Sequence, residues 1–101
     1  MASKRSANIA ASGRLILAID SYNAQNYDQA IPSLLTISEQ FDGTRNAGIA
    51  CYYLASAYYY KENYTEAKKY YLKYLDDYGD DNIFNCTALA GIASCFTHEG
   101  N

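Results

Sequence analysis

The chain has 101 residues, of which 50% are hydrophobic and 19% are charged, and its formal net charge at pH 7 is −3. This length is that of one domain, and the composition argues against intrinsic disorder. The acidic balance argues against nucleic acid as a partner, and no apolar stretch reaches the roughly 20 residues of a membrane-spanning helix. We therefore expect a single domain over residues 1–101, with no direct membrane insertion.

Apolar residues recur at the spacing of one helix face along most of the chain. The pattern predicts an all-α protein with five helices, at about residues 7–25, 27–41, 46–61, 64–78 and 82–98. Pro32 lies inside the second helix, where it removes a backbone hydrogen bond, so we expect a local kink there. The third helix is apolar nearly all round, which predicts a central position with neighbours on several sides.

Short polar motifs mark where two of these helices begin. Asn26 with Gln29, and Asn63 with Glu66, have the spacing of a capping box, in which both side chains bind backbone N–H groups at the start of a helix. Gly79 follows the fourth helix and suits the position just past its C-terminus.

The chemistry-bearing residues do not form a recognisable catalytic or metal site. Cys51, Cys86 and Cys95 form no C-x-x-C motif, so we interpret them as small buried apolar residues, and free thiols favour a reducing setting. The carboxylates of DDYGDD, at residues 76–81, lack the spacing of a calcium loop. His98 has no evident nucleophile beside it. We expect no catalysis, no metal and no cofactor.

The two capping motifs belong to a longer internal repeat. Residues 24–43 align with residues 61–80 at an offset of 37, which superimposes the Asn-Tyr pair at 26–27 on the pair at 63–64. A third start follows at an offset of 38, where EGN at 99–101 matches KEN in the second unit. The predicted units are a helix pair at about 7–41, a second pair at 46–78 and the first helix of a third unit at 82–101.

The second unit has a regular arrangement of small and large residues. Ala55 and Ala67 are its small positions, and its large positions are Cys51, Leu54, Tyr58, Tyr71 and Tyr74. Counted from Gly48, these positions resemble the degenerate 34-residue motif of the tetratricopeptide repeat (TPR) family. The resemblance extends from residue 11 to 101, although the first unit has Arg14 and Ser21 at positions that are usually large and apolar. It implies a right-handed superhelix of antiparallel helix pairs, with two full repeats and a terminal helix.

The loops between the helix pairs resemble those of one group within the TPR family. Three extra residues lie in FDGTRN and YGDDNI, and repeats of this length look like those of bacterial cell-envelope TPR proteins. That group includes outer-membrane assembly lipoproteins, Tol-Pal coordinators and the periplasmic ancillary subunit of the Sec translocon. The abrupt start of the helical pattern suggests a fragment of a longer protein. A cytoplasmic location stays open, as does a periplasmic one if the parent carries a leader or an anchor.

In TPR proteins the first helices of successive pairs line a concave groove that binds a peptide or a partner segment, without catalysis. By register, the groove residues here are Ile19, Tyr22, Asn23, Ile49, Tyr52, Ser56, Tyr59, Tyr60, Ser94 and Thr97. The alternative for Tyr52 and Tyr59 is packing between neighbouring first helices. Some family members clamp a peptide carboxylate with Lys, Arg and Asn, but those positions hold uncharged residues such as Leu15 and Ile19. The expected partner is therefore a hydrophobic, aromatic protein segment.

Tyrosine is unusually frequent, with twelve residues in the chain. Tyr58, Tyr71 and Tyr74 fall on packing positions of the repeat, and Tyr64 and Tyr78 lie beside the turns. A phenol ring adds a large apolar area when it is buried, so we expect these five to be mainly structural.

The last predicted helix has no following helix to cover it. Its apolar residues are Ile83, Phe84, Leu89, Ile92 and Phe96. Either the helix buries one apolar stripe on the second unit and acts as a cap, or it exposes a patch that is covered by a second copy, as in a homodimer, or by the remainder of a longer parent protein. We therefore expect a protein-interaction module, with self-association or scaffolding through this helix as the alternative.

Overall fold

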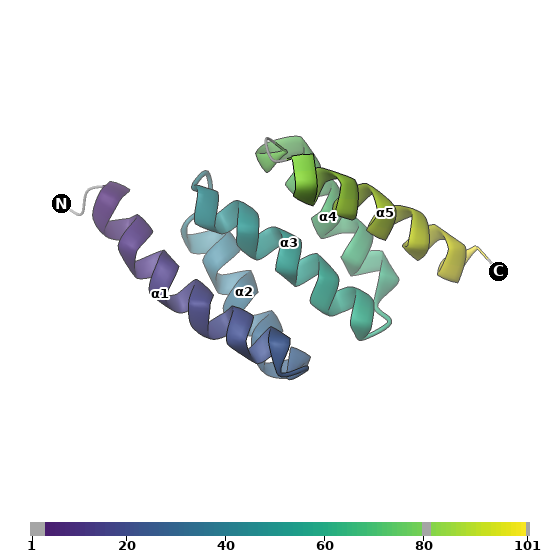
Figure 1. The fold of residues 1–101 in the computed structure, drawn as a ribbon, viewed down its shortest axis with the longest axis horizontal. Coiled ribbons are helices and arrows are strands. Elements are labelled where there is room, and N and C mark those ends of the chain that lie inside the picture. Colours follow the sequence, from purple (N-terminus) through teal and green to yellow (C-terminus); the bar gives the residue numbers. More distant parts are fainter. Residues whose placement is uncertain (1–3, 80–81, 101) are drawn as a thin grey trace.

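The computed structural model describes residues 4–79 and 82–100, and in that part every regular element is an α-helix (Figure 1). The helices are α1 (Lys4–Asn23), α2 (Tyr27–Gln40), α3 (Arg45–Tyr60), α4 (Tyr64–Tyr78) and α5 (Asn82–Glu99). The all-α prediction is confirmed, and each helix begins and ends within three residues of its predicted bounds. The largest difference is the start of α1, at Lys4 rather than at residue 7.

The helices form two layers. In Figure 1, α1, α3 and α5 run side by side in the same direction, and α2 and α4 lie behind them. Each helix contacts the next one along the chain, and α3 also contacts α1 and α5. Helix α3 therefore touches all four other helices, as its apolar surface predicts. Its buried residues are Ala47, Gly48, Ala50, Cys51, Leu54, Ala55, Ser56 and Ala57.

The two turns within the helix pairs have the same backbone conformation. Gln25 has a φ of 63° and Glu62 a φ of 64°, both in the left-handed region that non-glycine residues seldom adopt. The backbone N–H of Gln25 donates to the carbonyl of Tyr22 at 2.9 Å, and that of Glu62 donates to Tyr59 at 3.0 Å. These pairs are 37 residues apart, so the sequence repeat is also a repeat of the backbone.

Of the two predicted capping asparagines, Asn63 caps its helix and Asn26 does not. The side chain of Asn63 accepts a hydrogen bond from the backbone N–H of Glu66 at 3.5 Å. The prediction for Asn26 is wrong, because its Nδ2 donates to Gln29 Oε1 at 2.6 Å and its side chain binds no backbone group of α2. Thr44, which sequence reasoning missed, caps α3 by accepting a backbone N–H three residues further on at 3.2 Å.

Proline and glycine often mark the end of a helix, but Pro32 and Gly79 have different roles here. Helix α2 continues through Pro32, and Thr36 Oγ1 donates to the Pro32 carbonyl at 2.9 Å. Gly79 directly follows α4 with a φ of −77°, so it does not use the left-handed region. It is required for a different reason: a Cβ at this position would lie 2.5 Å from the carbonyl oxygen of Leu75.

Helices α1 and α5 each expose residues whose equivalents in α3 are buried, and the exposed residues differ between the two helices. Leu17 of α1 is 69% exposed, whereas Leu54, its equivalent in α3 at the offset of 37, is fully buried. Leu89 of α5 is 57% exposed, whereas Cys51, its equivalent at the offset of 38, is fully buried. Among the first helices α1, α3 and α5, only α3 has a first helix on both sides and contacts both second helices, α2 and α4, which explains why residues buried in α3 have exposed equivalents in α1 and α5.

Tyr78 fastens the loop between α2 and α3 to the end of α4. The backbone N–H of Gly43 donates to the Tyr78 hydroxyl at 2.9 Å, and that hydroxyl donates to Asp42 Oδ1 at 2.5 Å. The Tyr78 ring lies directly against Gly48 of α3, where a Cβ would come within 2.7 Å of the ring. The close approach of α3 and α4 therefore depends on a glycine at position 48.

We expect Gly48→Ala to destabilise the fold, because the added methyl group forces the Tyr78 ring out of place. Gly13→Ala is the matched control, since a Cβ at Gly13 has no other side chain within 4 Å. Both changes gain the same helix propensity, so their difference isolates the clash, which we expect to cost about 1–3 kcal/mol. Urea unfolding followed by circular dichroism measures it. Equal free energies of unfolding for the two variants would contradict the close packing at position 48.

Candidate functional site

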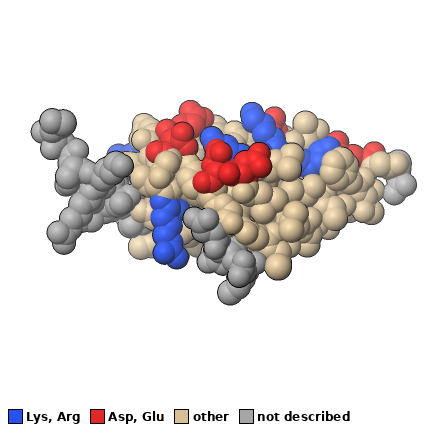
Figure 2. Space-filling view, turned by 90° about the horizontal axis from the view of Figure 1, so that it is seen from above, with Lys and Arg blue, Asp and Glu red and all other residues tan. Residues whose placement is uncertain are grey.

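Charged side chains are unevenly distributed over the two helix layers. Helix α4 alone carries six of them, whereas residues 46–60 of α3 and 84–97 of α5 contain none. Most of the charged residues in Figure 2 lie along the upper side of the view, and a broad uncharged surface lies below them. Most of the length of the first helices α3 and α5 is therefore uncharged.

Aromatic rings join the three first helices. Tyr22 of α1 meets Tyr53 of α3 edge to face, with centroids 5.1 Å apart. Tyr53 meets Tyr52 in the same way at 5.5 Å, and Tyr52 lies 4.7 Å from the Phe84 ring of α5. Edge-to-face pairs are attractive because the positive ring edge meets a negative ring face. This row of rings therefore stabilises the side-by-side arrangement of α1, α3 and α5.

A second row of rings crosses the other end of α3. Tyr27 stacks on Tyr60 at 5.5 Å, and Tyr60 meets Tyr59 edge to face at 5.6 Å. The imidazole of His98 stacks on Tyr64 at 4.7 Å, and its Nε2 lies 3.3 Å from the Tyr59 hydroxyl. The two rows meet where Tyr22 contacts Tyr27 and Tyr60. We call the tyrosines that α1, α3 and the first residue of α2 contribute to these rows the tyrosine face: Tyr22, Tyr27, Tyr52, Tyr53, Tyr59 and Tyr60.

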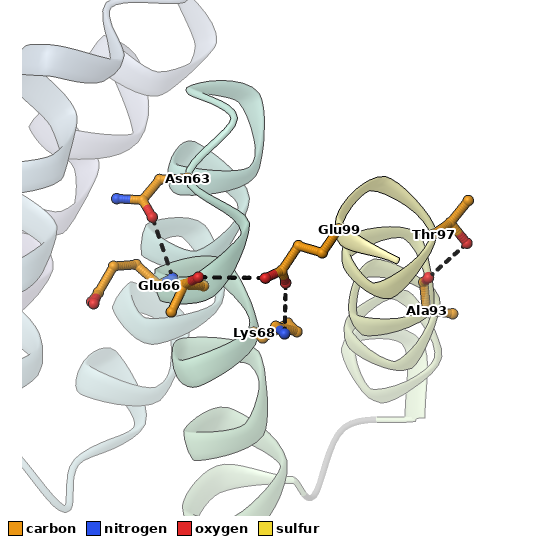
Figure 3. Close-up of polar contacts among 7 residues, drawn as sticks. Asn63, Glu66, Lys68, Ala93, Thr97 and Glu99 are labelled. Atoms are coloured by element: carbon orange, nitrogen blue, oxygen red, sulfur yellow. Dashed lines mark hydrogen bonds and ion pairs between the residues drawn. The ribbon is translucent and has the colours of Figure 1, made fainter. Parts of the chain in front are cut away.

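The predicted groove residues differ in how exposed their side chains are. Asn23, Tyr60 and Thr97 are exposed, and Ile19, Tyr22, Ile49, Tyr52, Tyr59 and Ser94 are half-buried. Ser56 is only 6% exposed and shares a hydrogen bond with the Tyr71 hydroxyl at 2.8 Å, so its assignment to the groove wall is wrong. Thr97 lies on the side of α5 that points away from α4, and its Oγ1 donates to the Ala93 carbonyl (Figure 3).

The rings of Tyr52 and Tyr59 pack between neighbouring first helices, and both side chains also stay partly exposed. Sequence reasoning missed Tyr27 and Tyr53 as members of the same surface. The helical pattern of α3 alone could not reveal them, since it does not show that Tyr22 of another helix lies beside them.

The residues of the apolar patch predicted on the last helix differ in how exposed they are. Leu89 is 57% exposed and Phe96 59% exposed, so both lie on the outer surface of α5. Phe84 and Ile92 are half-buried and pack on the core, so they contribute less exposed apolar surface than Leu89 and Phe96. The side chain of Ile83 lies outside the described residues. Helix α5 thus buries one stripe on α4, as a cap would, and exposes another.

The cysteines do not share one environment. Cys51 and Cys95 are buried as predicted, but Cys86 is exposed, which corrects the prediction of three buried thiols. Burial raises the pKa of the Cys51 thiol to about 11, so this thiol is neutral at physiological pH.

The described part of the chain offers neither a cluster of metal ligands nor a membrane-spanning helix. Within residues 4–79 and 82–100, no group of three or more His, Cys, Asp or Glu side chains could hold a metal ion, and Asp80 and Asp81 of the DDYGDD stretch lie outside that part. No helix among the described residues is both long and apolar enough to cross a membrane.

Burial keeps several tyrosine hydroxyls in their neutral form. It raises the pKa of Tyr71 to about 12, and it also raises the pKa values of Tyr22 and Tyr52. At physiological pH these groups remain O–H donors that can also accept a hydrogen bond.

No protein-family model matches this chain, and no significant match was found among curated proteins or among solved structures. The functional argument therefore rests on the internal repeat and on the geometry of the tyrosine face.

The buried phenol of Tyr71 predicts that the fold loses stability at alkaline pH. Below about pH 10 this group is neutral in both states, so it adds no pH dependence. Between about pH 10 and 12 the unfolded chain releases the proton and the folded chain keeps it, so the free energy of unfolding falls. Urea unfolding at several pH values measures this slope. Tyr71→Phe should reduce it, whereas Tyr60→Phe, at an exposed ring, is the control, and equal slopes for both variants would contradict the assignment.

Proposed function

We propose that this chain is a TPR-type module that binds an uncharged, aromatic or apolar segment of a partner protein on its tyrosine face, without catalysis. The observation that carries the proposal is the continuous set of partly exposed rings on α1, α3 and the start of α2, on a surface with few charges.

Three features support the TPR-type arrangement. The turns at Gln25 and Glu62 repeat the same backbone geometry at an offset of 37. Helices α1 and α3 each contact their own second helix, and the first helices α1, α3 and α5 contact one another in order, as in a stack of helix pairs. The small positions at Ala18, Ala55 and Ala67 are almost fully buried, which allows the helices of each pair to approach closely.

The chemistry of the tyrosine face suits a protein partner. Tyrosine is enriched at the energetic centres of interfaces, because a ring supplies a large contact area and a hydroxyl supplies one hydrogen bond. The rings here already contact one another, so binding has to order fewer side chains. The scarcity of charge on α3 and α5 favours an uncharged segment, since a buried charge in the partner would find no counter-charge.

Tyr60→Ala tests this proposal with little disturbance of the fold, because Tyr60 is 58% exposed. A peptide ligand is first selected from a displayed random library on the immobilised chain, and its Kd is then measured by fluorescence anisotropy. We expect Tyr60→Ala to raise the Kd at least about tenfold, which corresponds to about 1.4 kcal/mol.

Leu72→Ala is the matched control, because Leu72 is a half-exposed apolar residue of α4 outside the tyrosine face. Its Kd should equal that of the unchanged chain. If selection yields no ligand, or if the two variants weaken binding equally, the tyrosine face is not the binding site.

A further inference from the structure

The outer surface of α5 is the part of the molecule that the tyrosine-face proposal leaves unexplained. Six exposed residues share it, and we call them the outer face of α5: Cys86, Leu89, Ala90, Ala93, Phe96 and Thr97. Their equivalents in α3, at the offset of 38, are Gly48, Cys51, Tyr52, Ala55, Tyr58 and Tyr59. The outer face contains no charged residue.

In α3 part of the equivalent surface is covered by α4. Tyr58, the equivalent of Phe96, stacks on Tyr70 of α4 with centroids 5.8 Å apart. Cys51 and Ala55, the equivalents of Leu89 and Ala93, are fully buried. The repeat therefore uses this surface to hold a second helix, and α5 presents the same surface without one.

The two second helices show what such a surface accepts. Each presents a small residue, then a large residue four positions later and another three positions after that. The residues are Ala30, Leu34 and Ile37 in α2, and Ala67, Tyr71 and Tyr74 in α4. All six are buried, so this pattern forms the contact surface in both pairs.

We propose that the outer face of α5 binds an amphipathic helix of a partner protein that carries this small–large–large pattern on its apolar side. A second copy of the chain does not offer such a helix, because the matching faces of its α2 and α4 are already buried, with Leu34 fully buried and Tyr71 only 4% exposed. The helix that covers the outer face is therefore neither α2 nor α4 of another copy. The proposal does not depend on binding at the tyrosine face.

The outer face is held in a fixed position by polar contacts with α4 (Figure 3). The Lys68 ammonium lies 2.6 Å from Glu99 Oε1, and Thr65 Oγ1 donates to the same carboxylate at 3.5 Å. The Lys68 ammonium also lies 4.5 Å from the centroid of the Phe96 ring. Phe96 nevertheless stays 59% exposed, so most of the ring is available to a partner.

A synthetic peptide of residues 62–79 is the probe, because it carries the α4 version of the pattern. The fluorescently labelled peptide is titrated with the full chain and followed by anisotropy. We expect saturable binding that weakens at least about tenfold with Leu89→Glu and with Phe96→Glu. A peptide in which serine replaces the tyrosines equivalent to Tyr71 and Tyr74 should not bind.

Leu17→Glu is the matched control, because Leu17 is an exposed leucine at the opposite end of the stack. It should bind the peptide as well as the unchanged chain does, and so should Tyr60→Ala, which separates this test from that of the tyrosine face. Circular dichroism checks that each variant is folded.

Three results would overturn the inference. The first is the absence of saturable binding. The second is equal binding by Phe96→Glu and the unchanged chain, which would mean that the peptide replaces α4 instead of docking on α5. The third is a dimer of the unchanged chain, seen by light scattering without peptide and dissociated by Phe96→Glu, since a second copy would then cover the outer face.

Discussion

The arrangement depends on the close approach of helices at small residues, which leaves space that large rings fill. Gly48 faces the Tyr78 ring and Gly91 faces the Tyr71 ring, and in both places a Cβ would come within 2.7 Å of ring atoms. Alanines occupy most other buried positions of α3. Because the backbones come close, α3 can be buried against two neighbouring units at once. The abundance of tyrosine follows from this pairing of small residues on one helix with rings on the next.

The same residue type has two roles because a phenol is apolar over its ring and polar at its tip. Tyr71 is buried, and its hydroxyl shares a hydrogen bond with Ser56, so no polar group is left without a partner there. Tyr60 presents its ring to solvent and stacks on Tyr27. The charged residues are concentrated on α4 and near the turns, which leaves the layer of first helices to be defined by rings.

The helical pattern predicted much of this fold, because apolar spacing reports which residues share one face of a helix. It predicted the helix bounds, the repeat and the central place of α3. It could not predict which neighbour covers a face, and the errors follow from that. Cys86 matches the buried Gly48 in register but is exposed because nothing covers it, and Ser56 is buried because the Tyr71 ring lies against it. Within the tyrosine face, Tyr53 was missed because its partner, Tyr22, comes from another helix.

The exposure of the end helices shows that the two ends of the stack are not equivalent. Helix α1 exposes Ile16 and Leu17, whose equivalents in α3 are Tyr53, which contacts Tyr22 of the preceding unit, and the fully buried Leu54. Helix α5 exposes Leu89 and Phe96, whose equivalents face a second helix. A partner that fits one end therefore does not fit the other, because each end requires a different half of the repeat. This polarity favours partners that add to the stack in one direction over a symmetric pairing, which would have to bring two identical half-faces together.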